Sequence, residues 1–444
     1  MLRSVVYQKF ERSRVGEQGL YVVWSFSPSN RSAWPHPITE PHWQKQDDRL
    51  LFWRRLEQLQ DQGLILSNLD NDIAAHADVP GLAIAVTKNG KIIYEPGFGW
   101  ADRERGMRAT PKTPFALASV SKSITATAIM QLFERGRLNL DAPVNDYLGS
   151  AKVHSPHWNA TESTVRRVMS HTGGLTTFTR WCGYDRSACN LDREIRDYGI
   201  LVWRPGDVFD YSNLGFGILG EVIVRVSGNE YDSYLKKNIF IPLGMEGCGL
   251  KTRQRASTQY DEKTHAPSPA RISGTPGASG LRCSAHDLAL FGMYQLKETT
   301  NANSILSFSS LDQMHRAQPG TRGQYGLGWW TSQKGGTKVI SAQGGTSDTY
   351  ALLTLVPTKN VAVIVVANSY SQFVSNLGER ILDVVVPELS APAARPAPRG
   401  HLGAVVRYGR MVRPYARAGR PSPSLSDHYC RWCCARQACR WNAD

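Results

Sequence analysis

A serine and a lysine three residues apart are the first residues in this chain whose types and spacing could carry out a reaction. The stretch from Phe115 to Gly136 reads FALASVSKSITATAIMQLFERG and places Ser119 one helical turn before Lys122. A serine hydroxyl needs a base within hydrogen-bonding reach to act as a nucleophile, and burial lowers the pKa of a lysine so that it can be that base. The first turn of a helix also offers N–H groups that stabilise an oxyanion. The pair therefore indicates acyl transfer.

The helix that must position this pair is predicted from apolar residues at helical spacing. These residues are Ile124, Ala128, Ile129, Leu132 and Phe133. We expect Ser119 to be the N-cap, the helix to begin at Val120 and Gly136 to follow its end. A serine that caps a helix beside a surface lysine is the commoner arrangement, and about two S-x-x-K matches are expected by chance in a chain of this length. The second match here, Ser233 to Lys236, lies in a polar segment.

A tyrosine and an asparagine form the second candidate group, in FDYSNLGFGILGEVI at Phe209 to Ile223. Tyr211 and Asn213 directly precede a predicted Gly-rich helix. A tyrosine beside a lysine ammonium has its phenolate form favoured, so Tyr211 could exchange a proton with the serine or the leaving group. Asn213 could hold a substrate carbonyl or the lysine. The alternative is an aromatic residue at a turn with Asn213 as a helix cap.

The elements around these groups predict an α+β fold, an α/β sandwich. Asn89-Gly90 joins two strand-like runs in LAIAVTKNGKIIY, which is typical of a β-hairpin. Later strand-like runs are Lys338 to Ser341, Tyr350 to Val356 and Val361 to Ala367, and two amphipathic segments follow Asp48, the second at Leu64 to His76. We expect the early and late strands to form one antiparallel sheet with flanking helices, and residues 120–330 to form a mostly helical lobe. A cleft between sheet and lobe would be a natural site, and Ser119 lies where the lobe begins.

Composition excludes some classes of protein. The 444 residues carry a formal charge of +14, but the segment from Ala391 holds ten Arg against two Asp and contributes +8 of it. The remaining charge is dispersed, so we expect no nucleic-acid partner, and no apolar run reaches the length of a transmembrane segment. No G-x-S-x-G or H-E-x-x-H motif occurs, which argues against an α/β-hydrolase and a zinc hydrolase.

Six segments together resemble the β-lactamase-related serine hydrolases. They are PFALASVSKSITA, MSHTGGL, FDYSNLGFGILG, IFIPLGM, SGLRCSAHDLALFG and YGLGWW, in this order between Gln58 and Pro387. That family includes class C β-lactamases, D-alanyl-D-alanine carboxypeptidases, D-aminopeptidases and β-lactamase-like carboxylesterases. The resemblance implies the β-lactamase/transpeptidase-like fold, an antiparallel sheet with flanking helices and an all-helical domain. It also implies that Ser119 is acylated, that Lys122 is its base or proton relay, that Tyr211 passes a proton to the leaving group and activates water, and that Asn213 contacts substrate.

The third motif of the family is altered in this chain. Relatives carry Lys, His or Trp two residues before a glycine on the strand that lines the site. In VISAQGGTSDTYALLTLVP, Ala342 stands at that position, or Gln343 if the alignment shifts by one residue. Neither side chain is a cation. A Lys or His there helps to hold the carboxylate of a β-lactam or a D-alanine terminus, so its absence weakens the antibiotic and peptidase interpretations.

The glycines of the same segment can still serve catalysis. The N–H of Gly345, or of Thr346 under the shifted alignment, could complete an oxyanion hole with the N–H of Ser119. The alternative is that Gly344 and Gly345 only let the strand pack closely. A neutral ester becomes the favoured substrate.

Other residues are expected to be structural. His171 in MSHTGGL is interpreted as a buried structural histidine, and Trp329-Trp330 as residues that pack the sheet or rim the pocket. Cys182 and Cys189 are close enough to pair in an oxidising compartment, while Cys248 and Cys283 are dispersed. The C-terminal CRWCCARQACRW has irregular spacing, so we expect no metal site and no cofactor.

The sequence therefore predicts one β-lactamase-related serine hydrolase domain over residues 48–389. Residues 1–47 are expected to be a poorly ordered leader without a clear signal peptide, and residues 390–444 a disordered Pro/Arg/Cys-rich tail. The predicted function is hydrolysis of a small-molecule or peptide substrate, an ester or amide, through an acyl-enzyme on Ser119. The alternatives are a D-Ala or D-amino-acid peptidase, a β-lactamase, or a penicillin-binding-type scaffold without turnover. We expect a soluble protein, and the sequence leaves its export and oligomeric state open.

Overall fold

The computed structural model describes residues 73, 78–177, 190–252, 254–269, 273–298 and 305–390. All belong to the first of the two units into which the chain divides, Met1–Ala393. The predicted leader, the pair Cys182 and Cys189, the C-terminal tail from residue 391 and, apart from Ile73, the two amphipathic segments after Asp48 lie outside the described residues. No helix within the described ranges is long and apolar enough to cross a bilayer.

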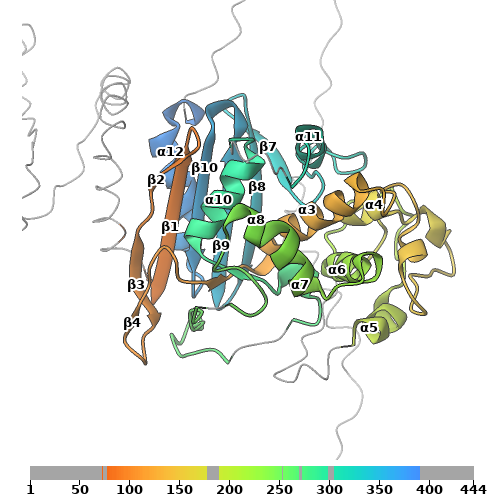
Figure 1. Ribbon diagram of the computed structural model, residues 1–444, viewed down its shortest axis with the longest axis horizontal. Coiled ribbons are helices and arrows are strands. Elements are labelled where there is room, and N and C mark those ends of the chain that lie inside the picture. Colours follow the sequence, from red (N-terminus) through yellow and green to blue (C-terminus); the bar gives the residue numbers. More distant parts are fainter. Residues whose placement is uncertain are drawn as a thin grey trace, which may run out of the picture. The chain divides into compact units, whose positions relative to one another are not determined.

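An antiparallel sheet in the order β4-β3-β1-β10-β9-β8-β7, with β2 paired to β1, forms one side of the fold (Figure 1). Its strands are β1 Gly81–Lys88, β2 Lys91–Tyr94, β3 Gly97–Asp102, β4 Met107–Arg108, β7 Trp330–Lys334, β8 Thr337–Thr346, β9 Thr349–Val356 and β10 Val361–Ala367. β1 pairs with β10, with Leu82 opposite Ala367. The predicted joining of early and late strands in one antiparallel sheet is confirmed.

The hairpin between β1 and β2 turns at the predicted dipeptide. Asn89 and Gly90 have φ values of 51° and 72°, the left-handed conformations that such a two-residue turn requires. The late strand predicted at Lys338 to Ser341 is longer than expected and reaches Thr346. Its additional residues include the third motif, so that motif lies on the sheet.

Helices cover both faces of the sheet. Side chains alternate along β1, so Leu82 and Ile84 face the helix α12 (Gln372–Val385), whereas Ala83 and Ala85 face the other side, which α10 (Ala285–Gln295) covers. β10 is buried on both faces, which explains its continuous apolar sequence. Since α10 lies within the expected helical lobe and packs on the sheet, the middle of the chain supplies both the lobe and one cover of the sheet.

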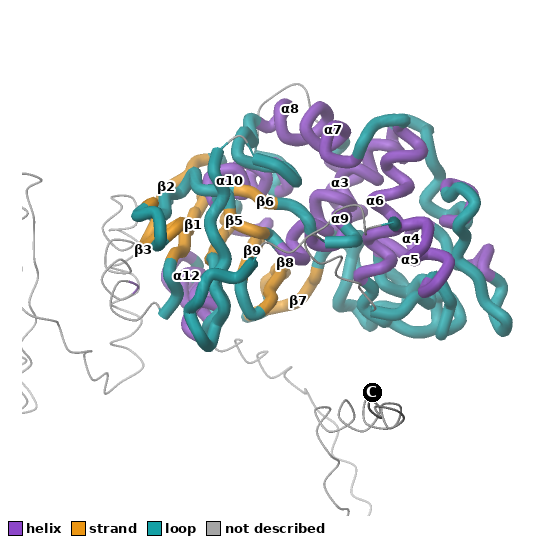
Figure 2. Tube along the Cα trace, turned by 90° about the horizontal axis from the view of Figure 1, so that it is seen from below, coloured by secondary structure: helices purple, strands orange, loops and turns teal. Residues whose placement is uncertain are grey.

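The helical lobe is built around α3, Ser121–Glu134 (Figure 2). The other lobe helices are α4 Val165–Met169, α5 Leu191–Tyr198, α6 Asn213–Ser227, α7 Tyr231–Leu235, α8 Ile241–Leu243, α9 Pro276–Ser279 and α11 Phe308–Met314. α3 contacts α6 and α9, and its residues from Ser121 to Leu132 are all buried. α6 and α9 approach closely because Gly277 lacks a side chain: a Cβ there would lie 2.4 Å from Phe216 O. The helix that follows Ser119 is therefore enclosed on several sides.

The start of α3 differs from the sequence prediction. The helix begins at Ser121 and its N-cap is Val120, with no side-chain capping bond. Ser119 lies in the 3-10 turn Ala118–Val120 that precedes it, so its hydroxyl is not used as a cap. Gly136 follows the helix end with φ 65°, as expected.

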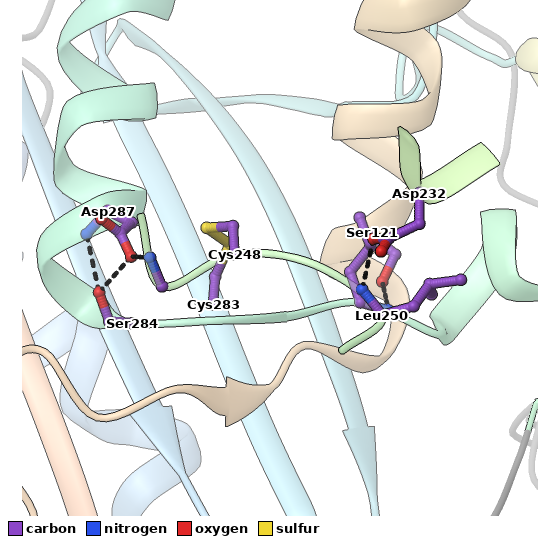
Figure 3. The surroundings of a disulfide bond; sticks show 9 residues. Ser121, Asp232, Cys248, Leu250, Cys283, Ser284 and Asp287 are labelled. Carbon is purple, nitrogen blue, oxygen red and sulfur yellow. Dashed lines mark hydrogen bonds between the residues drawn. A yellow bond between two sulfur atoms is a disulfide. The ribbon is translucent and has the colours of Figure 1, made fainter. Parts of the chain in front are cut away.

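A disulfide joins Cys248 and Cys283, two residues that the sequence did not pair (Figure 3). They are 35 residues apart, and the fold brings them together because Gly249 and Arg282 exchange backbone hydrogen bonds of 2.9 and 3.0 Å. Arg282 and Cys283 form the short strand β6, which pairs with β5, Phe115–Ala116. The disulfide thus supports the strand that leads to Ser119.

Candidate active site

The backbone before Ser119 holds its hydroxyl in place. Leu117 donates its N–H to Leu281 O at 2.9 Å, and Val120 donates to Leu117 O at 3.1 Å. Ala118 between them has φ 42°, a conformation that a residue with a side chain rarely adopts. The bonds of the 3-10 turn come from Val120 and Ser121, which leaves the N–H of Ser119 available to a ligand. Strain at such a position is a feature that functional sites often retain.

Lys122 contacts three oxygen atoms at the buried end of the site. Its Nζ lies 3.0 Å from Ser119 Oγ, 2.8 Å from Asn213 Oδ1 and 3.0 Å from Ala278 O. The side chain is 1% exposed, and burial lowers its pKa from 10.5 to about 7. A neutral amine has two N–H donors and one lone pair. The two carbonyl-type oxygens accept the donors, so the lone pair faces the serine hydroxyl.

Tyr211 is hydrogen-bonded to Ser119 from the other side. Burial raises the pKa of Tyr211 to about 12, although the bond to Ser119 lowers it in part. The direction is the reverse of the phenolate expected from the sequence, because burial disfavours the charged phenolate and Lys122, whose Nζ is 4.8 Å from the ring centroid, is itself neutral above about pH 7. Burial therefore keeps the proton on Tyr211 near neutral pH, whereas it favours the neutral amine of Lys122.

Asn213 is the first residue of α6 and binds the lysine. Ser212, not Asn213, caps the helix, since its hydroxyl accepts from Gly215 N at 2.9 Å. The amide of Asn213 accepts from Lys122 through Oδ1 and donates to Thr177 O through Nδ2 at 3.4 Å. Of the two roles that the sequence left open, holding the lysine is the one that these contacts support.

His171 is buried behind Tyr211, with ring centroids 4.2 Å apart. Its Nδ1 accepts from Ser212 N at 3.0 Å, so a neutral ring carries its proton on Nε2. Burial, together with the charge of Lys122, holds the pKa of His171 well below its usual value. A neutral histidine with these contacts supports the tyrosine and the start of α6, in line with the structural role expected for it.

The third motif passes Ser119 at the open edge of β8. β7 begins at Trp330, opposite Ser341, so the residues of β8 after Ser341 are not paired with β7. Side chains alternate, so that Ala342 points into the core while Gln343 lines the site. Gly344 shares the face of Ala342, and a Cβ on it would lie 2.3 Å from Ser119 N. Close approach to the nucleophile therefore requires glycine there.

A cavity of about 540 Å³ opens in front of Ser119. The described residues that line it are Ser119, Tyr211, Glu262, Trp330, Gln343, Gly344, Gly345, Thr346, Ser347 and Tyr370. Trp330 stacks on Tyr211 with an interplanar angle of 6° and rims the cavity, whereas Trp329 is fully buried. Of the two roles that the sequence allowed, Trp329 therefore packs in the core and Trp330 rims the pocket.

Some residues of the site carried no signal in the sequence. Ala278 contributes a backbone carbonyl to Lys122, and Glu262 and Tyr370 line the cavity from segments without a recognisable motif. Within the described ranges, no group of three His, Cys, Asp or Glu residues is placed to hold a metal ion.

Comparison with known proteins identifies the family. The model of the beta-lactamase family matches residues 69–385, well over half of the chain. The chain belongs to the beta-lactamase family, a family of serine hydrolases. Protein flp of Staphylococcus aureus strain MRSA252 is 26% identical over 328 residues, which cover 69% of this chain and 63% of flp. The putative penicillin-binding protein PbpX of Bacillus subtilis is 30% identical over 256 residues, 56% of this chain and 61% of PbpX. The chain thus spans less than two thirds of these relatives' length.

Solved structures share the fold. The octameric penicillin-binding protein homologue from Pyrococcus abyssi has a TM-score of 0.61 and 26% identity, with 74% of this chain and 78% of that chain covered. A class C beta-lactamase from Rhodobacter sphaeroides has a TM-score of 0.59 and 23% identity, with 74% and 99% covered. The predicted β-lactamase/transpeptidase-like fold is confirmed.

Proposed function

We propose that this protein hydrolyses esters or amides through an acyl-enzyme on Ser119. The observation that carries the proposal is the environment of Lys122, a buried lysine with a pKa of about 7 whose Nζ lies 3.0 Å from Ser119 Oγ. A base is most effective when its pKa is near the working pH. Burial of this lysine costs free energy, because its contacts are two neutral oxygen acceptors and a serine hydroxyl instead of a carboxylate. A purely structural role does not explain that cost.

In the proposed reaction, neutral Lys122 takes the proton of Ser119 as Oγ attacks the substrate carbonyl carbon. The negative charge that develops on the carbonyl oxygen is stabilised by the N–H groups of Ser119 and Gly345. When the tetrahedral intermediate collapses, the bond to the leaving group breaks and Tyr211 donates a proton to that group, recovering one from Lys122. Water then attacks the acyl-enzyme by the same route and releases the acid.

The favoured substrates are esters and amides that carry no carboxylate. Ala342 is buried in the core, and none of the described residues that line the cavity is Lys or Arg. None of these lining residues comes from the segment Lys251 to Arg255. The carboxylate of a β-lactam or of a D-alanine terminus would therefore lack a cation there. A β-lactamase and a binding scaffold without turnover are alternatives that the following experiment separates, and a peptidase is a further alternative.

The experiment measures initial hydrolysis of a short-chain nitrophenyl ester and of a chromogenic cephalosporin. Wild type is compared with Ser119→Ala, and Ser233→Ala serves as the matched control because Ser233 begins the other S-x-x-K match and is exposed. We expect ester turnover by wild type and by Ser233→Ala, its loss in Ser119→Ala, and an acyl adduct on Ser119 by mass spectrometry. Ester turnover that survives Ser119→Ala would refute the proposal. A faster reaction with the cephalosporin would favour the β-lactamase, and binding of either compound without turnover would favour the scaffold.

A further inference from the structure

The residues that line the cavity include one with a carboxylate and several with aromatic rings. Glu262, Trp330 and Tyr370 line the same cavity as Ser119, and all three side chains are partly exposed. The backbone N–H of Glu262 donates to Ser347 O at 2.9 Å, in the turn between β8 and β9. This bond fixes Glu262 beside the end of β8 without using its carboxylate.

Glu262 gives the cavity its charge. The other described lining residues are uncharged near neutral pH, given that burial keeps Tyr211 protonated. Unlike Glu262, the nearby Asp348 is buried, and Arg282 lies close enough to interact with its charge. Glu262 is half-buried and lines the cavity.

The aromatic rings are held in place and left uncovered. Trp330 stacks on Tyr211 with centroids 6.1 Å apart and meets Tyr325 edge to face at 4.9 Å. Tyr370 also lines the cavity and lies next to Gly345, where a Cβ would be in ordinary van der Waals contact with its ring at 3.8 Å. Aromatic faces and a carboxylate are the groups that attract an ammonium ion.

We propose that the substrate carries a cationic amine, held by the carboxylate of Glu262 and the rings of Trp330 and Tyr370. This inference rests on the proposed hydrolase function and narrows its substrates. An ammonium group gains a Coulombic partner and aromatic faces in this cavity, whereas a carboxylate would meet the like charge of Glu262 and find no cation from Ala342. Glu262 is thus a specificity residue.

The test compares substrates that differ only in charge. Acetylthiocholine is paired with its uncharged isostere, in which a tert-butyl group replaces the trimethylammonium group, so the cation lies on the leaving side. The nitrophenyl ester of trimethylammoniobutyric acid and its tert-butyl isostere place the cation on the acyl side. Wild type is compared with Glu262→Gln, which keeps the shape and removes the charge. Glu230→Gln is the control, because Glu230 is an exposed acid outside the cavity lining.

In at least one pair we expect wild type to show kcat/KM about tenfold higher for the cation, a ratio typical of a partly desolvated cation–π and carboxylate site. Glu262→Gln should bring that ratio close to one, Glu230→Gln should keep it, and added salt should reduce it. If wild type prefers the neutral ester in both pairs, or if Glu262→Gln keeps the preference, the inference is wrong while hydrolysis through Ser119 still stands.

A binding measurement separates this inference from the proposed function. If no ester is hydrolysed, the proposed function fails, and calorimetric titration with phenyltrimethylammonium then tests the cation site directly. Binding to wild type that weakens about tenfold in Glu262→Gln supports the site. Equal binding by both proteins, or none to wild type, overturns it.

Discussion

The lowered pKa of Lys122 has a measurable effect on the stability of the protein. This lysine titrates at about 10.5 in the unfolded chain and at about 7 when folded. Between these values the unfolded state binds more protons, so the free energy of unfolding rises with pH across this window. At about 1.36 kcal/mol per pKa unit, the contribution of Lys122 rises by about 2.3 kcal/mol between about pH 7 and about pH 9. Lys122→Met removes the titrating group and should abolish this rise.

The assay is urea denaturation of wild type and Lys122→Met at several pH values, with the difference in unfolding free energy plotted against pH. Taking this difference cancels the contributions of the other titrating groups that both proteins share, such as the buried tyrosines, to the unfolding free energy. Lys236→Met is the control, because Lys236 is a partly exposed lysine paired with Asp232, and its removal should leave the slope unchanged. In parallel, kcat/KM for ester hydrolysis should increase with pH and level off above an apparent pKa of about 7.

Parallel stability curves for wild type and Lys122→Met would refute the lowered pKa. The base assignment would then also fail, since an ammonium with its ordinary pKa cannot accept a proton from the serine near neutral pH. The two conclusions would separate if the unfolding free energy rose with pH as predicted but kcat/KM did not depend on pH. The lysine would then be buried and neutral, and the proton would leave the serine by another route.

Further variants test the positioning of the nucleophile, the role of the amide and the disulfide. Gly344→Ala should lower kcat/KM at least ~100-fold, because the new Cβ would lie 2.3 Å from Ser119 N. Gly345→Ala is the matched control and should keep the fold and most of the activity, because the nearest contact of its Cβ would be 3.6 Å. Equal losses in the two variants would contradict the close approach. Asn213→Asp should raise the pKa of the lysine and shift the acidic limb of the pH–rate profile upward by about one unit or more; an unchanged limb would contradict this contact. Replacing both cysteines of the described disulfide by serine should lower the unfolding free energy by about 3 to 4 kcal/mol, since the closed loop spans 35 residues; denaturation with and without reductant measures this, and no difference would show that the bond does not form.

The chemical groups and the sheet were predicted from the sequence because both leave local patterns. Ser119 and Lys122 lie one turn apart wherever that segment is helical, and Asn89-Gly90 specifies its turn through two left-handed residues. The sheet followed from the short strand-like runs at both ends of the domain, which can bury their apolar faces only by pairing. These features depend on residues close in sequence or on simple periodicity.

The site's electrostatics depended on the tertiary structure. Desolvation reverses the expected direction of the Tyr211 pKa, and the burial responsible comes from side chains such as His171 and Trp330, which are distant in sequence. The sequence analysis weighed the neighbouring lysine charge but could not judge how deeply Tyr211 is buried, because that is set by how the whole chain packs.

By itself, then, the sequence predicted the family and the sheet, both of which are confirmed, and named the candidate reacting groups. The tertiary structure decided that Ser119 lies in a 3-10 turn instead of capping its helix, that Ala278 supplies an oxygen to the lysine, and that Glu262 faces the cavity. The reason is physical: hydrogen-bond partners, burial and charge at this site come from segments that approach only when the chain is folded. A pattern of neighbouring residues specifies which groups can react, while long-range packing sets their pKa values and their substrates.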